Sequence, residues 1–161
     1  MTTSTSLRMH SAVFTEGAAI PRRHTGDGED LSPPLSWQGL PAAARELALI
    51  VDDPDAPSKE PWVHWVIYNL PATVNDLPEG ISVAVQAKVA PGAIQGKNSW
   101  NTVGYRGPAP PKGHGTHRYY FKLYALDSQL NLPAGLDKAG LLKKLKGHVL
   151  SEAALMGTYQ R

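Results

Sequence analysis

The sequence predicts a mainly β protein, built largely from antiparallel strands with one or two helices appended. The chain of 161 residues contains 15 glycines and 14 prolines, a content that suits short strands joined by many loops. Three stretches are rich in aliphatic, β-branched or aromatic residues, whereas helical spacing is confined to the C-terminal part. The length, together with the lack of any repeat or low-complexity linker, predicts a single domain over residues 1–161.

Three central strands are predicted first. Glu46–Asp53 is a continuous apolar run that enters an acidic corner, as expected of a strand buried on both faces. Val63–Leu70 is β-branched and aromatic and stops before a proline, and His117–Asp127 is rich in aromatic residues. Shorter strands are predicted near Ser11–Phe14 and Ile81–Val89.

The remaining segments are predicted as a tail, a loop and a helix. Residues 1–6 are expected to form a flexible tail. Pro21–Pro41 is rich in glycine, proline, aspartate and serine and is expected to be an ordered loop, with Trp37 covering the core. Within Asp137–Met156, three leucines recur at helical spacing before Gly147. Residues Val149–Met156 are ambiguous between helix and strand.

Composition excludes several classes of function. A net charge of +2 without a dense basic run does not indicate nucleic-acid or membrane-surface binding. The absence of cysteine excludes disulfides, thiolate metal sites and a cysteine nucleophile. No signal sequence is visible, and the longest aliphatic run is shorter than the ~20 residues that span a bilayer. We therefore expect a cytoplasmic protein, although a periplasmic protein that has lost its leader would look the same.

Polar residues gather at the ends of the predicted central strands. Asp53 ends the first, and His117 and Tyr119 begin the third, where they face the same side. His64 begins the second strand and is expected to share a face with Val66 and Tyr68. If the three strands are neighbours, Asp53, His64, His117 and Tyr119 converge at one edge of the sheet. Taken singly, Asp53 also fits a solvated turn, and His64 fits a hydrogen-bonded core histidine.

A segment rich in glycine and proline precedes the third strand. It reads GYRGPAPPKGHGTHRY, from Gly104 to Tyr119, and is called the Gly-Pro loop below. Prolines stiffen such a loop, and glycines let backbone N–H groups approach a ligand closely. It therefore fits an anion cradle as well as a plain connection. His114, within it, is expected to be a solvent-exposed loop residue.

Three motifs follow one another along the chain: DPDAP at Asp53–Pro57, PWVHW at Pro61–Trp65 and GPAPPKGHGTHRY at Gly107–Tyr119. In this order they resemble the phosphatidylethanolamine-binding protein (PEBP) family and its bacterial, Raf kinase inhibitor-like branch. The likeness extends over nearly the whole chain, through DGEDLSPPLSW, QGKNSW and LYALD.

This resemblance implies an antiparallel β-sandwich, with a large central sheet packed on a smaller sheet and one or two peripheral helices. It also implies a pocket for phosphate-like anions at the edge of the large sheet. Asp55 would brace the loop rather than contact the ligand, and the ligand-binding residues would be Asp53, Trp62, His64, Gly107, Pro110, Pro111, His117 and Tyr119.

The function expected from these observations is non-enzymatic binding of a small anion, such as phosphate or a phosphoryl head group, without metal or cofactor. One alternative is a metal-dependent hydrolase or oxygenase that uses Asp53, His64 and His117. Another is a protein-interaction or inhibitor module in which the pocket is a regulatory socket. A homodimer is also possible, with Trp65, Tyr120 and Tyr124 as candidates for a contact patch.

Overall fold

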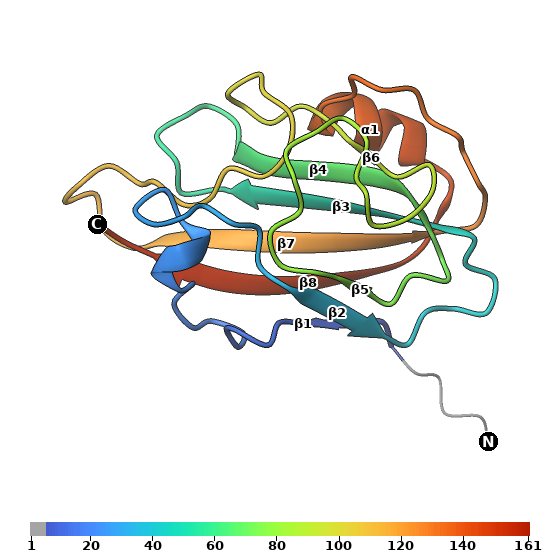
Figure 1. Ribbon diagram of the computed structural model, residues 1–161, viewed down its shortest axis with the longest axis horizontal. Helices are drawn as coiled ribbons and strands as arrows, with labels where there is room; N and C mark the ends of the chain where they lie inside the picture. Colours follow the sequence, from blue (N-terminus) through green and yellow to red (C-terminus); the bar gives the residue numbers. More distant parts are fainter. Residues whose placement is uncertain (1–5) are drawn as a thin grey trace.

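The computed structural model describes residues 6–161, which form two antiparallel sheets and one α-helix (Figure 1). The smaller sheet has three strands, in the order β1 (Arg8–His10), β2 (Leu35–Gln38) and β5 (Asp76–Leu77). The larger sheet has five, in the order β6 (Ile94–Gln95), β4 (Trp62–Pro71), β3 (Glu46–Asp53), β7 (His117–Leu126) and β8 (Val149–Tyr159). The predicted sandwich of a large and a small sheet is confirmed.

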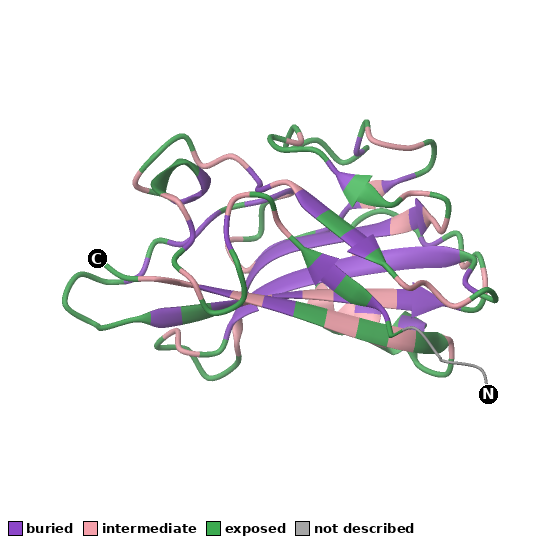
Figure 2. Ribbon diagram, turned by 90° about the horizontal axis from the view of Figure 1, so that it is seen from below, coloured by how far each residue is buried: buried purple, intermediate pink, exposed green. Residues whose placement is uncertain are grey.

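Strand β3 lies at the centre of the larger sheet, and every one of its residues is buried. Leu49 and Val51 pack in the core between the two sheets, while Ala48 and Ile50 pack in a second core beneath the helix. Figure 2 shows the central strands buried along almost their whole length. The continuous apolar run of this strand is explained by this double burial, because neither face meets water.

Helix α1 (Lys138–Leu145) covers the second core through Leu141 and Leu145. It begins after Asp137, whose Oδ1 accepts a hydrogen bond from the N–H of Gly140 at 2.9 Å, an N-cap that stabilises the first turn. The ambiguous segment Val149–Met156 is a strand, because it pairs with β7 along its length as part of β8. This tertiary pairing decides between two local preferences that the sequence leaves balanced.

Both predicted short strands are wrong. In Ser11–Phe14 the serine hydroxyl donates to Pro34 O at 2.7 Å and accepts from the N–H of Val13, a local turn that ends the pairing of β1. Ile81–Val89 makes only an isolated bridge. Its backbone carbonyls at Ser82 and Ala84 instead accept hydrogen bonds from the side-chain amide of Gln95, which replaces a neighbouring strand.

The predicted loop Pro21–Pro41 contains a 3-10 helix (Arg22–His24) and strand β2. Trp37 lies on β2 with 5% of its surface exposed, and its indole N–H donates to Val74 O at 3.0 Å. The tryptophan thus covers the core as predicted, but from a strand. Of the predicted tail, residues 1–5 lie outside the described part of the chain.

No helix within residues 6–161 is long and apolar enough to cross a membrane. Trp65 is fully buried and therefore cannot contribute to a surface patch, whereas Tyr120 and Tyr124 are partly exposed on β7. The homodimer stays a prediction.

Candidate functional site

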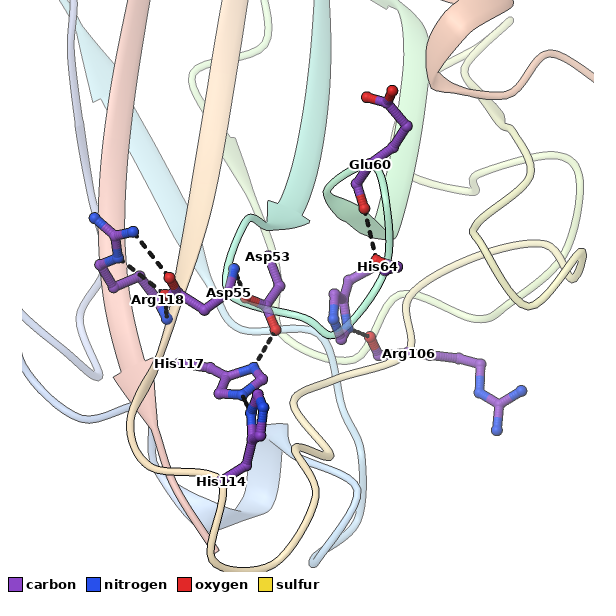
Figure 3. A network of polar contacts seen from close by, with 9 residues as sticks. Asp53, Asp55, Glu60, His64, Arg106, His114, His117 and Arg118 are labelled. Atoms are coloured by element: carbon purple, nitrogen blue, oxygen red, sulfur yellow. Dashed lines mark hydrogen bonds and ion pairs between the residues drawn. The ribbon is translucent and has the colours of Figure 1, made fainter.

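The polar residues of the central strands meet at one end of the larger sheet, because β4, β3 and β7 are neighbours. His117 Nδ1 lies 2.6 Å from Asp53 Oδ2, and the His64 and Tyr119 rings are 5.1 Å apart, edge to face. Figure 3 shows Asp53 and His117 pointing toward one another from the ends of their strands. The convergence expected from the sequence is therefore present.

The orientation of His64 differs from the expectation. Val66 and Tyr68 pack in the core beneath α1, whereas the His64 ring contacts Tyr119 and Trp100. Tyr119 belongs to the core between the two sheets. His64 and the two other residues thus do not share a face of β4.

A β-bulge accounts for this orientation. Val51 pairs with Trp65 and Asp52 pairs with Val63, so His64 is an extra residue without a partner on β3. Such a bulge turns a side chain that would otherwise point to the other face, and bulges are frequent beside binding sites. Here it directs the imidazole toward the pocket.

A cavity of about 270 Å³ lies at this end of the sheet. Seven of the eight residues predicted to bind ligand line it: Asp53, Trp62, His64, Pro110, Pro111, His117 and Tyr119. Its remaining lining residues were not singled out from the sequence: Ala56, Pro57, Ser58, Trp100 and Ala109. The proline and alanine side chains make this lining largely apolar, with the polar groups gathered on the strand ends.

Gly107, the eighth predicted residue, does not line the cavity. Its N–H donates to Asp30 Oδ1 at 2.8 Å, and a β-carbon at this position would collide with the carbonyl oxygen of His24. Gly107 is therefore needed for close packing of the Gly-Pro loop against the segment around Asp30. Its N–H is already occupied and is not available to an anion.

Asp53, His117 and His114 form a hydrogen-bonded row (Figure 3). Asp53 Oδ1 accepts from the N–H of Asp55 at 2.8 Å, and its Oδ2 is joined to His117 Nδ1. The other ring nitrogen of His117, Nε2, lies 2.6 Å from His114 Nδ1. Asp53 and His117 are buried, with 3% and 2% exposed, whereas His114 is exposed. His114 is thus a solvent-exposed loop residue, as expected, and in addition it contacts His117.

His64 is held in one tautomer. Its Nδ1 lies 2.6 Å from the carbonyl oxygen of Arg106, so Nδ1 carries the proton and donates it, and Nε2 of the neutral ring is an acceptor. Burial lowers the pKa of His64, because the charged imidazolium loses its hydration. A neutral His64 therefore adds no positive charge to the pocket at neutral pH.

Tyr119 contributes a hydroxyl that stays protonated. Burial raises the pKa of Tyr119, and the negative charge of Asp53 raises it further. The hydroxyl can therefore serve as a donor throughout the physiological pH range. It places a polar hydrogen-bonding group in the largely apolar lining.

Two tryptophans shape one side of the cavity. Trp62 and Trp100 meet edge to face, with ring centroids 5.5 Å apart, and the Arg106 guanidinium lies 4.6 Å from the Trp100 ring centroid. Trp100 was not predicted as a site residue. The only signal for Trp100 in the sequence is its place in the motif QGKNSW, which is part of the family resemblance.

Asp55 braces the acidic corner from outside the cavity. Its carboxylate accepts a hydrogen bond from the backbone N–H of Arg118 at 2.8 Å. It accepts two more from the guanidinium of the same arginine, each at 2.9 Å. These hydrogen bonds are the main reason that the pKa of Asp55 is lowered. The turn after β3 is thereby tied to β7, in the position expected of a supporting residue.

The metal-dependent alternative is not favoured by this geometry. Within residues 6–161, no group of three or more histidine, aspartate and glutamate side chains is arranged to hold a metal ion. His64 directs Nδ1 to a carbonyl, and the rings of His64 and His117 both lie against Tyr119. The donor atoms of Asp53, His64 and His117 are therefore not directed at one point.

The fold and the cavity define a β-sandwich binding protein whose pocket lies at the end of its larger sheet. Residues 10–160 match the family model described as phosphatidylethanolamine-binding protein. The chain belongs to this family.

Individual relatives agree with this assignment. A UPF0098 protein of Methanothermobacter thermautotrophicus is 50% identical, and the match covers 97% of this chain and 99% of that protein. The crystal structure of a putative PEBP homolog from Chlamydia trachomatis is 40% identical with a TM-score of 0.88, covering 98% and 99% of the two chains. Escherichia coli YbcL, titled a new member of the mammalian PEBP family, is 31% identical with a TM-score of 0.90, covering 97% and 99%.

Proposed function

We propose that the protein is a non-enzymatic binding protein that receives a small anion, such as phosphate or a phosphoryl head group, in the cavity at the end of the larger sheet. The observation that carries the proposal is the buried pair of Asp53 and His117 beside the Tyr119 hydroxyl, within an otherwise apolar lining. The family name supports a phosphoryl group as the anionic part of the ligand.

The charges around the pair decide how an anion can bind. A carboxylate alone would repel an anion, so the positive charge of a protonated His117 has to lie between Asp53 and the ligand. Asp53 fixes the orientation of the ring through its contact with Nδ1. The N–H and O–H groups of His117 and Tyr119 would then donate to phosphoryl oxygens, as charge-assisted hydrogen bonds in the case of His117.

The apolar part of the lining indicates where the rest of the ligand would lie. Trp62, Trp100 and the two prolines present carbon surface beside the polar end. A phosphomonoester with a short apolar or aromatic group would bury that group against them, and each Å² of apolar surface removed from water contributes about 25 cal/mol. We therefore expect phenyl phosphate to bind more tightly than inorganic phosphate.

The test is a calorimetric titration of phenyl phosphate into the wild-type protein and His64→Ala, at about pH 5.5 and about pH 8, on either side of the range in which histidine titrates. Affinity should fall at the higher pH, because loss of the imidazolium charge leaves the Asp53 carboxylate facing the anion. His64→Ala should bind about fivefold more weakly at both values, because it removes the ring that packs edge to face against Tyr119 and Trp100, and with it part of the lining. Equal affinity in all four titrations would contradict the proposal.

A further inference from the structure

The two ring nitrogens of His117 are both occupied. Nδ1 is bound to Asp53 and Nε2 is bound to His114, each at 2.6 Å. A phosphoryl oxygen that binds His117 must therefore use Nε2, since Nδ1 is buried against the carboxylate. That position is filled by a side chain of the protein itself.

One proton fits between the two imidazoles. With no proton, the lone pairs of His117 Nε2 and His114 Nδ1 would face one another, and with two protons the N–H groups would collide. The contact therefore holds a single shared proton, as a hydrogen bond in one direction. As long as it persists, Nε2 of His117 has nothing to donate to a ligand.

The loop that carries His114 is built so that this contact can open. His114 is exposed, unlike His117, and its neighbours Gly113 and Gly115 have φ angles of 74° and 92°. A β-carbon at either glycine would meet no other atom within 4 Å. The left-handed conformations are readily adopted only by glycine, and the backbone of this loop tip makes two long hydrogen bonds, from Gly113 N to Arg161 O at 3.4 Å and from His114 N to Pro111 O at 3.2 Å. Moving His114 away thus costs its contact with His117 and, where the backbone follows, these two long hydrogen bonds.

We infer that His114 is a self-capping residue of the pocket: it occupies His117 Nε2 in the empty protein and is displaced when an anion binds. This inference rests on the proposed function and adds its regulation. A ligand has to compete with an internal hydrogen bond, so His114 lowers the apparent affinity of every anion that uses Nε2 by the same factor. The exposed loop then moves with the state of the pocket.

The test compares phenyl phosphate binding, at one near-neutral pH, by the wild type, His114→Ala and His114→Asn. Removing the cap in His114→Ala should tighten binding about fivefold, the equivalent of one typical hydrogen bond. His114→Asn keeps a polar atom near the position of Nδ1 and should stay close to the wild type. His148→Ala is the matched control, because this exposed histidine pairs with Asp127, at the opposite end of β7.

Nitrogen-15 spectra of the imidazole rings supply a second readout on the wild type. Phenyl phosphate should move the His114 resonances toward those of a free histidine while it perturbs His117 Nε2. If the wild type binds phenyl phosphate and His114→Ala binds equally or more weakly, the cap is wrong and the anion pocket stands. If neither protein binds, the proposed function fails and the cap fails with it.

Discussion

Three histidines lie close together at the site, and their surroundings give each a different task. His64 is buried with its Nδ1 proton committed to a backbone carbonyl, so it forms part of the lining as a neutral ring. His117 is buried with its Nδ1 2.6 Å from the Asp53 carboxylate, so its ring is fixed in orientation. His114 is exposed on a loop and reaches only the outer nitrogen of His117. The three histidines thus differ in their burial, in their hydrogen-bond partners and in their access to solvent.

The buried neutral ring has a consequence for acid stability. Because burial lowers the pKa of His64 below its ordinary value of 6.5, the unfolded chain takes up a proton more readily than the folded protein. The stabilising contribution of a neutral His64 is therefore complete above pH 6.5 and is lost as the pH falls through the folded-state pKa. We expect the free energy of unfolding to decline over that acidic range.

His64→Asn tests this prediction, because an asparagine amide can still donate to Arg106 O but does not titrate. Urea unfolding over a series of pH values should give a shallower acid decline for the variant than for the wild type. Parallel declines would assign the acid sensitivity to other groups. Asp55 is such a group, but its lowered pKa places its loss of stability below its ordinary value of 3.8.

At the scale of elements, the pocket depends on a segment that does not line it. The chain from His24 to Asp30 holds the Gly-Pro loop at three points: Tyr105 Oη donates to His24 O at 2.6 Å, Gly26 N to Pro108 O at 2.8 Å, and Gly107 N to Asp30 Oδ1 at 2.8 Å. These bonds fix the backbone of the stretch Tyr105–Pro108, which leads directly into Ala109 and Pro110. The N-terminal segment thereby positions one wall of the cavity.

Asp30 is the member of this segment whose role can be separated by substitution. It adopts a φ of 59°, which asparagine and glycine tolerate better than alanine. Asp30→Asn keeps the backbone and the acceptor, Asp30→Gly keeps only the backbone, and Asp30→Ala keeps neither. We expect Asp30→Gly to expose the Gly107 amide to hydrogen exchange and to weaken phenyl phosphate binding several-fold, while Asp30→Asn stays close to the wild type.

The order of the three variants distinguishes positioning from general stability. If Asp30→Gly loses thermal stability but binds phenyl phosphate as the wild type does, the wall does not depend on Asp30. If Asp30→Asn binds as weakly as Asp30→Gly, the lost negative charge is responsible and the acceptor is not.

Sequence reasoning worked best for elements with strong local patterns. The three central strands carry continuous or aromatic runs, and their adjacency brings Asp53, His117 and Tyr119 together, as their place at strand ends predicts. The two predicted short strands, Ser11–Phe14 and Ile81–Val89, do not form, because neither segment pairs along its length with a neighbouring strand. Val149–Met156 could not be assigned, because its conformation depends on pairing with β7.

Site details that depend on distant contacts were not predictable. The orientation of His64 follows from a bulge, which exists only in the register between β3 and β4. Gly107 faces Asp30, which lies 77 positions away in the sequence, so its N–H could not be recognised as occupied. The contact of His114 depends on the path of a loop with four glycines, each of which widens the conformational choice.

In the whole molecule, the larger sheet separates two hydrophobic cores. The pocket lies at one end of this sheet, where the central strands extend beyond both cores. Each of the three strands β4, β3 and β7 contributes a polar residue there, and loops from both halves of the chain close the sides. The central strands are buried throughout and hold these residues in place. A rigid scaffold of this kind preorganises a binding site, since little conformational entropy is lost when the ligand arrives.

The proposed function requires that an anion binds at the Asp53–His117 end of the larger sheet. The most direct measurement is a crystal structure of the protein soaked with phenyl phosphate. We predict a tetrahedral group in the cavity, bonded to His117 Nε2 and the Tyr119 hydroxyl, with the phenyl ring against Trp62 and His114 turned away. If the cavity stays free of phosphate while the anion binds to surface lysines or arginines, the proposed anion site is wrong.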